Sequence, residues 1–299
     1  MRKRHRPCED EAALRLAVIF ALAIVLLPVP VHAEGTVRGV VHQRFIALLN
    51  PMGMEHTLEV GARARLGDPR EILFMGAHAE GGLVSYVSPV YAMHGAYVQV
   101  SPLAFLVLRA ELTHSQLWPI GMSGAGYYGL SGYEEDVSPS ALNAERGEAA
   151  SGWSARAYAT LQGLVPLGPV RLLIQDQLIV QHASLGGASH YYDMKWDLIL
   201  ARQDLVLING AVLLLEIDLE ATTHLRLGGY DDVRFVPGSG YLGHQVGPMV
   251  MLTLDRPAPE VPSLSIFVRG GYYTHHVIRR DELTILGGVA VDYDLGAIR

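Results

Sequence analysis

A few histidine and serine side chains lie close enough in the sequence to suggest ester hydrolysis. That chemistry needs a nucleophile, a base and a group that orients the base, all within hydrogen-bond reach. One residue separates His182 from Ser184, His114 directly precedes Ser115, and both pairs lie at the expected outer ends of strands. The chain has 13 histidines, so such pairs also arise by chance. We therefore expect the chain not to be an enzyme and keep His182 and Ser184 as outside catalytic candidates.

Patterns for metals and cofactors are weaker. His275 and His276 are adjacent, so in a strand they point to opposite faces and cannot share one ion. The acidic runs 231–232 and 134–136 could hold a divalent cation loosely, but such runs are more typical of solvated loops. The sequence shows no glycine-rich phosphate loop and no Cys–His zinc spacing. We predict no metal and no cofactor.

The first 33 residues have the three parts of a secretory signal peptide. Residues 2–6 are basic, residues 16–27 form an uninterrupted apolar run, and Val31-His32-Ala33 is a small-x-small cleavage site. The apolar run is too short for a transmembrane helix, which needs about 20 residues. We expect cleavage after Ala33 and a mature chain of 34–299, which has no cysteine because Cys8 leaves with the peptide.

The composition excludes several classes of protein. Of the 299 residues, 50% are hydrophobic and 18% are charged, which is incompatible with a disordered chain. The net charge of −7 argues against nucleic acid as a partner, because phosphates attract a basic surface. After residue 33 the apolar runs, such as 103–108 and 211–215, are too short for a transmembrane helix.

Apolar and polar residues alternate with a period of two, as in half-buried strands. The segments are 57–66, 104–113, 153–162, 192–200, 211–220 and 285–295. They are about ten residues long, whereas strands of soluble proteins average about 5–6. Their apolar faces carry Trp153, Tyr192 and Tyr293, typical of aromatic girdles at a bilayer interface. A soluble β-sandwich also alternates, but length and girdle favour a transmembrane barrel.

The breaks between these segments predict about 12 strands, with 10–12 as the range. They fall at 50–55, 67–70, 82–90, 101–102, 115–150, 165–169, 183–190, 202–204, 222–239, 255–262 and 279–282. Short and long breaks mostly alternate, as periplasmic turns and extracellular loops do in outer-membrane barrels. Segment 36–49 alternates poorly, so it is read either as the first strand or as a helix or plug. The break 115–150 predicts a long extracellular loop.

At the level of pattern, residues 34–299 resemble bacterial outer-membrane β-barrel proteins of the porin kind. The last strand is partly similar to the signal read by the barrel-assembly machinery, which Gly288, Val291 and Tyr293 fit, although Leu286 replaces the polar residue. The resemblance implies an all-β, antiparallel up-and-down barrel in the outer membrane. It also implies membrane lipid, lipopolysaccharide and the assembly machinery as partners. Outer-membrane phospholipase A carries a His-x-Ser-Asn run, whereas here Leu185 follows Ser184.

If the apolar faces meet lipid, the charged faces line the lumen, because charge on the lipid face costs about 2–4 kcal/mol near the midplane. The predicted pore-lining residues are Arg63, Arg65, Arg109, Glu111, Arg156, Arg171, Asp193, Asp197, Glu216, Asp218 and Glu220. The arginines come early and most acidic residues late, which predicts basic and acidic walls on opposite sides.

A lumen of this kind predicts a passive channel for small polar or charged solutes. Three alternatives remain open at this point. The arginines and carboxylates could pair with one another into a polar core that plugs the lumen. The barrel could be a non-conducting structural or adhesive protein that acts through loop 115–150. It could also be a lipid hydrolase.

Overall fold

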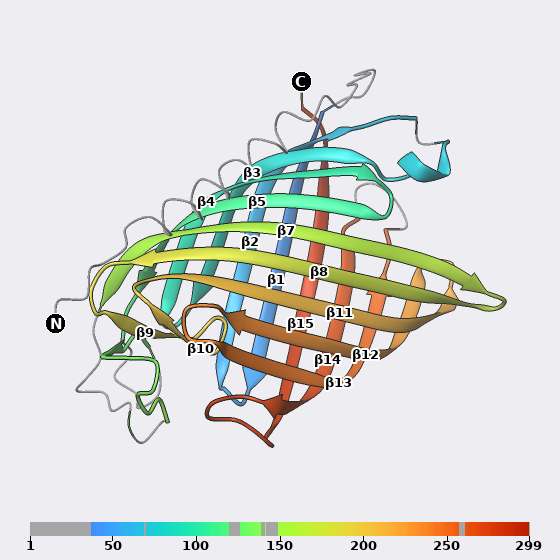
Figure 1. The fold of residues 1–299 in the computed structure, drawn as a ribbon. Coiled ribbons are helices and arrows are strands. Elements are labelled where there is room, and N and C mark those ends of the chain that lie inside the picture. The colour runs from blue at the N-terminus through green and yellow to red at the C-terminus, as the bar shows by residue number, and fades with distance from the viewer. Residues whose placement is uncertain are drawn as a thin grey trace.

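The protein forms a closed antiparallel barrel of twelve strands, as predicted (Figure 1). The computed structural model describes residues 37–68, 70–119, 126–138, 141, 149–256 and 261–298. The expected signal peptide, 1–33, lies outside these residues. The barrel strands are β1 (Arg38–Leu49), β2 (Gly53–Arg65), β3 (His78–Ser88), β4 (Tyr91–Leu103), β5 (Leu106–Leu117), β7 (Ala150–Leu167), β8 (Val170–Leu185), β11 (Gln203–Glu220), β12 (Thr223–Val236), β13 (Tyr241–Leu254), β14 (Ser263–His275) and β15 (Leu283–Ala297).

The outer surface of the barrel is apolar on every strand. Leu83, Leu112 and Leu213, for example, expose 68%, 53% and 54% of their surface. Their neighbours along the same strands point inward, so that Glu111 and Thr113 on either side of Leu112 are buried. A continuous band of exposed large apolar side chains is stable against lipid and not against water. The alternation therefore sorts residues between lipid and lumen, as expected.

The strand order places both ends of the barrel chain together. Arg38 at the start of β1 pairs with Ala297 at the end of β15, and we call this the terminal end. The opposite end, the loop end, carries the connections 50–52, 89–90, 118–149, 186–202, 237–240 and 276–282. The expected alternation of short and long connections is only partly correct. Segment 66–77 on the terminal end is long and contains the 3-10 turn η1 (Ile72–Phe74), whereas 89–90 on the loop end is a tight turn.

One segment that was predicted as a barrel strand lies outside the barrel sheet, and one strand of the barrel was not predicted. Segment 192–200 lies in a hairpin of β9 (His190–Asp193) and β10 (Leu198–Ala201), which forms a separate sheet with β6 (Gly129–Leu130). The missing strand is β12, inside the expected break 222–239. Its Gly228-Gly229 and Asp231-Asp232 pairs have the composition of a turn but lie in the middle of the strand. The two errors cancel in the strand count.

Two further boundaries are settled by the strand pairing. Segment 36–49 had been read either as a strand or as a plug. It contains β1, which closes the barrel between β2 and β15. The expected break 82–90 is largely strand, because β3 runs to Ser88. Among the described residues, no helix is long and apolar enough to cross a bilayer.

Candidate functional site

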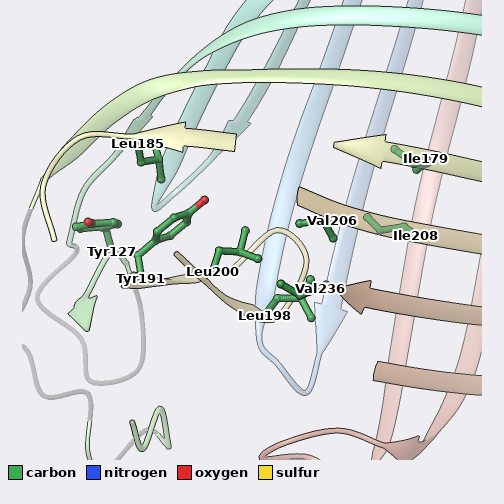
Figure 2. Packing of buried hydrophobic residues seen from close by; sticks show 9 residues of the cluster. All are labelled: Tyr127, Ile179, Leu185, Tyr191, Leu198, Leu200, Val206, Ile208 and Val236. Atoms are coloured by element: carbon green, nitrogen blue, oxygen red, sulfur yellow. The ribbon is translucent and has the colours of Figure 1, made fainter. Parts of the chain in front are cut away.

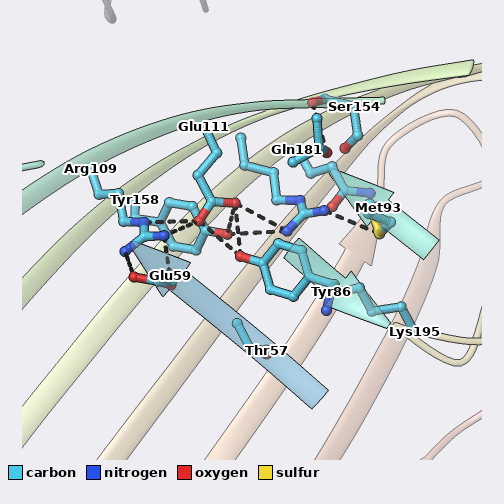
Figure 3. Close-up of polar contacts among 12 residues, drawn as sticks. Thr57, Glu59, Tyr86, Met93, Arg109, Glu111, Ser154, Tyr158, Gln181 and Lys195 are labelled. Atoms are coloured by element: carbon cyan, nitrogen blue, oxygen red, sulfur yellow. Dashed lines mark hydrogen bonds and ion pairs between the residues drawn. The ribbon is translucent and has the colours of Figure 1, made fainter. Parts of the chain in front are cut away.

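The inner wall of β2–β7 carries a buried network of ion pairs centred on Arg109 and Glu111 (Figure 3). Arg109 donates to both carboxylate oxygens of Glu59, at 2.9 and 2.8 Å, and its Nε donates to Glu111 at 2.8 Å. Arg156 donates to the other oxygen of Glu111 at 3.2 Å. The hydroxyls of Tyr86 and Tyr158 donate to Glu111 at 2.9 and 3.0 Å. Each charge therefore has an opposite charge in contact, which buried ions require.

Two more ion-pair clusters lie closer to the terminal end. In the first, Arg63 donates to Glu80 at 2.6 Å, and His42 lies between Glu80 and Asp292. In the second, Glu216 pairs with Arg171 at 2.8 Å and with Arg226 at 2.5 Å. Arg171 also contacts Asp218, and His224 lies between Asp218 and Asp255 at 2.5 and 3.0 Å.

The predicted separation into a basic wall and an acidic wall is wrong. Each inward-facing arginine in these clusters contacts carboxylates on its own or a nearby strand, so the interior has no large transverse field. The arrangement is the alternative in which the charges pair with one another. Of the predicted pore-lining residues, those on the inner wall within these clusters are Arg63, Arg109, Glu111, Arg156, Arg171, Glu216 and Asp218. Arg65 and Glu220 are exposed strand ends at the terminal end.

Asp193 and Asp197 are not wall residues, because they belong to the β9–β10 hairpin. Both lie at its turn, and the carboxylate of Asp193 accepts from the backbone N–H groups of Lys195 and Trp196 at 2.9 and 3.2 Å. These bonds shape the turn and present Lys195, Trp196 and Asp197 to the barrel. Tyr192 is 3% exposed in the hairpin and is therefore no girdle residue, whereas Trp153 and Tyr293 lie on the outer surface as expected.

The first attachment of the hairpin to the wall is the ammonium group of Lys195. It contacts the carboxylate of Glu55 on β2, which the Tyr91 hydroxyl also contacts, at 2.5 Å. The ammonium lies 4.1 Å from the ring centroid of Tyr86, which is within cation–π range. The side chain of Lys195 is 12% exposed. Lys195 is the only lysine after residue 3, and it pins the hairpin to one side of the barrel.

The second attachment is Asp197, whose side chain is 4% exposed. His276 and Arg279, from the connection 276–282, lie 3.2 and 3.0 Å from its carboxylate, and Tyr192 and Tyr273 also donate to it. Burial alone would raise the pKa of Asp197, but the bond from His276 and the charge of Arg279 hold this pKa below its ordinary value. Asp197 is therefore ionised and ties the hairpin to the loop that joins β14 and β15.

Between these two attachments the hairpin packs on the wall through an apolar core (Figure 2). Tyr191, Leu198 and Leu200 of the hairpin lie against wall residues of β8, β11 and β12. The buried members of this core are Tyr127, Ile179, Leu185, Tyr191, Leu198, Leu200, Val206, Ile208 and Val236. Tyr127 comes from the predicted long loop 115–150, which thus folds partly onto the hairpin. Residues 120–125, 139–140 and 142–148 of that loop lie outside the described residues.

The two ends of the lumen therefore differ in what fills them. The loop end contains the inserted sheet and buried side chains. At the terminal end several charged side chains reach water, with exposures of 52% for Asp218, 55% for Asp255 and 44% for Asp292, whereas Glu80 and Glu216 are each 2% exposed. Arg63 and Arg171 are exposed by 36% and 35%. The site is thus a charged mouth at one end of the barrel, with a hairpin that spans from β2 to the connection 276–282 at the other end.

One group of side chains in the described part of the chain has the spacing of a metal site. Glu216, Asp218 and His224 offer ligand atoms within 4.8 Å of one another. Arg171 and Arg226 already contact these carboxylates. The guanidinium groups supply the positive charge that a cation would bring, so the cluster is satisfied as an ion-pair network. The acidic pair 231–232 is split between the two faces of β12, because Asp232 binds Arg234 inside while Asp231 faces outward.

The histidine and serine candidates do not assemble into a catalytic group among the described contacts. Ser184 accepts a weak bond from Gln203 at 3.4 Å, and no hydrogen bond joins it to His182. His114 packs edge-on against Trp153, with 5.0 Å between ring centroids, while Ser115 is buried on the opposite face of β5. Their assignment as catalytic candidates stays a prediction without a geometric basis.

Several lumen residues were not singled out from the sequence. Glu55, Glu59, Glu80, Arg234 and Arg279 all carry ion pairs. Alternation placed Glu59 on the polar face of its segment, but its partner Arg109 is 50 residues away. Which charged residues pair depends on the register of the strands that lie between them, and a single sequence holds no direct signal for this register.

The fold and its surfaces define the class of this protein. A closed antiparallel barrel with an apolar outer band and a charged interior is a bacterial outer-membrane β-barrel protein.

Comparison with known proteins adds likenesses at low identity. No protein-family model and no curated protein sequence matches the chain. Among solved structures, the β-domain of the Bordetella autotransporter BrkA is 11% identical, with a TM-score of 0.47, over 88% of this chain and 99% of that one. The NalP translocator domain of Neisseria meningitidis is 13% identical, with a TM-score of 0.41, over 95% and 97%. The porin NanC is 7% identical, with a TM-score of 0.37, over 85% and 98%. The class assignment depends on the barrel's own topology and surface.

Proposed function

We propose that this protein is a gated passive channel for small polar or charged solutes, with the segment 186–202 as its gate. The observation that carries the proposal is that a sheet separate from the barrel lies at the loop end and contacts opposite parts of its wall. Strands β6, β9 and β10 pair only with one another, so the closure is held by side chains and not by a shared ladder. Such a segment can leave the lumen without breaking the barrel.

The charged mouth at the terminal end supports a route for ions. Asp218 and Asp255 are 52% and 55% exposed and Arg171 is 35% exposed, so water reaches this part of the interior, although the Glu216 carboxylate that Arg171 also contacts is 2% exposed. Paired charges of both signs give such a mouth weak overall selectivity, which suits small polar solutes of either sign. We place the terminal end in the periplasm and the loop end outside the cell.

The same proposal includes how the protein reaches its membrane. Residues 1–33 direct export and are removed after Ala33, and residues 34–299 form the working barrel. The barrel-assembly machinery inserts it, with Gly288, Val291 and Tyr293 of β15 as part of the signal. Membrane lipid and lipopolysaccharide then surround the apolar outer band.

The direct test is the conductance of the refolded barrel, residues 34–299, in planar bilayers. Lys195→Met removes the ammonium that contacts Glu55 and should raise the fraction of time spent open at least about tenfold. Lys195→Arg keeps the charge and should behave like the parent. Asp218→Asn should shift the reversal potential in a salt gradient.

A folded, heat-modifiable barrel that shows no current steps with any of these variants would contradict the channel. The closed lumen would then be permanent. A structural or adhesive role through loop 115–150 would replace the proposal, and deletion of 120–145 would be expected to abolish surface binding.

A further inference from the structure

The outer surface of the barrel carries a carboxylate–imidazole–hydroxyl chain that takes no part in closing the lumen. Nε2 of His244 lies 2.9 Å from Oδ2 of Asp231, and Nδ1 of the same ring lies 2.5 Å from Oγ1 of Thr274. Because an ionised carboxylate only accepts, the tautomer with the proton on Nε2 leaves Nδ1 to accept from the hydroxyl. The three residues lie on the neighbouring strands β12, β13 and β14. This order of groups is the one that activates a hydroxyl nucleophile, with a base to take the proton and a carboxylate to orient the base.

All three side chains face outward near the loop end. Gly243 and Gln245, on either side of His244, are buried toward the lumen, whereas Leu242 on the same face as His244 is exposed. The side chains of His244 and Asp231 are 30% and 44% exposed. His244 follows shortly after the start of β13, and Thr274 is the last residue but one of β14. The cluster is therefore accessible from the edge of the membrane at the loop end.

A β-bulge presents the threonine hydroxyl. His244 pairs with His275 and Gln245 pairs with Tyr273, so Thr274 is an extra residue with no partner on β13. Bulges re-aim a side chain and are frequent next to active sites. The irregularity occurs at the residue whose hydroxyl reaches the imidazole.

Other histidines in the described part of the chain lack one of the three groups. His94 is 2.9 Å from the hydroxyl of Ser85 on the outer surface, but no carboxylate contacts its ring. His42 and His224 each lie between two carboxylates inside the barrel and contact no hydroxyl. Only His244 combines a carboxylate and a hydroxyl among the described contacts.

We propose that Thr274, His244 and Asp231 form an acyl-transfer site for the carboxylic esters of membrane lipids. The substrate class follows from position, because the ester groups of lipids lie at the boundary between acyl chains and headgroups. Thr274 is the nucleophile, His244 the general base, and Asp231 a positioning residue for the imidazole. The site does not depend on whether the lumen conducts.

The reaction balances with water as the second reactant. Oγ1 of Thr274 bonds to the acyl carbon while its proton passes to Nδ1 of His244. The bond from the acyl carbon to the lipid oxygen breaks, and that oxygen takes the proton from His244. An acyl-threonine ester remains. Water then attacks this ester, one proton returns through His244 to the threonine oxygen, and the fatty acid is released.

The test uses the whole refolded barrel and two readouts. An alkyl fluorophosphonate probe, followed by peptide mass spectrometry, reports where an activated hydroxyl lies. Fatty acid release is measured from phosphatidylethanolamine vesicles and, separately, from vesicles that contain lipid A. We expect the probe on Thr274 and release from at least one kind of vesicle. The vesicle that is hydrolysed identifies the lipid source.

Matched variants separate catalysis from structure. Thr274→Ala should abolish labelling and release, and His244→Gln should slow release at least about 100-fold. Thr274→Ser should retain activity. Ser85→Ala should also retain activity, because it changes only the separate pair of Ser85 and His94, which no carboxylate contacts. Asp231→Asn should lower the rate without lowering the melting temperature, and Asp231→Glu should restore part of it.

Three results would overturn the proposal. The first is a folded barrel in which the fluorophosphonate does not label Thr274. The second is the absence of fatty acid release from both kinds of vesicle. The third is fatty acid release by Thr274→Ala at the rate of the parent. If Thr274→Ala does not fold, the comparison of His244→Gln with Thr274→Ser decides in its place.

Discussion

The two halves of the lumen are built on the same twelve strands, yet they use charge in different ways. In the loop-end half, Glu111 and Arg156 each expose 1% of their side chains. In the terminal-end half, Asp218 and Arg171 expose 52% and 35%. Both halves alternate apolar and polar residues along their strands. Glu80 and Glu216 of the terminal-end half are nevertheless 2% exposed, so the two halves differ in some of their charges and not in every ion pair.

The hairpin adds two buried charges of its own, Lys195 and Asp197, to the loop-end half. Where β9 and β10 enter, charges are buried and must be paired with good geometry. At the terminal end, water screens exposed ion pairs such as Arg171–Asp218, and such pairs contribute little to stability.

Removing a charge from the buried network should cost the most. Glu111→Gln keeps the shape of the side chain but leaves Arg109 and Arg156 without their shared carboxylate. We expect the free energy of unfolding to fall by about 3–5 kcal/mol, the usual cost of breaking a buried pair. Urea unfolding of the barrel in lipid vesicles measures it. Glu220→Gln, at an exposed strand end, is the matched control and should change nothing measurable.

Removing one attachment of the hairpin should expose the loop-end half of the lumen to water. Lys195→Met leaves the Glu55 carboxylate buried without its ammonium partner, so the closed state loses stability relative to an open one. Trypsin should then cleave the segment 186–202 faster, by about tenfold or more. Equal cleavage of Lys195→Met and the parent at their shared Arg202 site would show that the attachment is not what holds the hairpin.

The closure should resist mild acid. A carboxyl whose pKa is held below its ordinary value stabilises the state that holds it at all pH values above that ordinary pKa. This stability is lost only as pH falls through the lowered pKa, and Asp197 is such a group. Lowering pH from about 7 to about 5 should therefore not release the hairpin through Asp197. Release at pH 5 in the parent, but not in Asp197→Asn, would contradict this.

Changing a water-exposed charge should have the smallest effect. Asp218→Asn removes a carboxylate at the terminal-end mouth, where water and Arg171 already screen it. We expect the melting temperature to stay the same and the cation preference of any current to decrease slightly. A large loss of stability would mean that this half is as dry as the other.

The sequence predicted the wall better than it predicted the interior. Alternation assigned Leu112 to lipid and Glu111 to the lumen, because a strand places neighbours on opposite faces. The same period of two made the segment 192–200 look like a wall strand, because polar residues of its turn, such as Lys195, alternate with apolar ones. In the structure both faces of the hairpin are buried, with Tyr191 in one apolar cluster and Tyr192 in another. Strand β12 was missed because Gly228 and Gly229 are turn formers by composition, whereas here they lie in a paired ladder.

The ion pairs could not be predicted for a different physical reason. Arg109 on β5 reaches Glu59 on β2 over the ring of Tyr97, with its guanidinium 4.2 Å from the ring centroid. That contact depends on barrel curvature and on the register of three intervening pairings. Likewise, His276 and Arg279 meet Asp197 only because the hairpin folds inward.

We propose that a removable hairpin closes an otherwise conducting barrel. Single-channel currents of the parent barrel should be compared with those of a variant in which a short Gly-Ser linker replaces residues 187–201. We expect rare openings for the parent and sustained current steps for the variant, with both proteins heat-modifiable and folded. A folded variant that carries no current would contradict it.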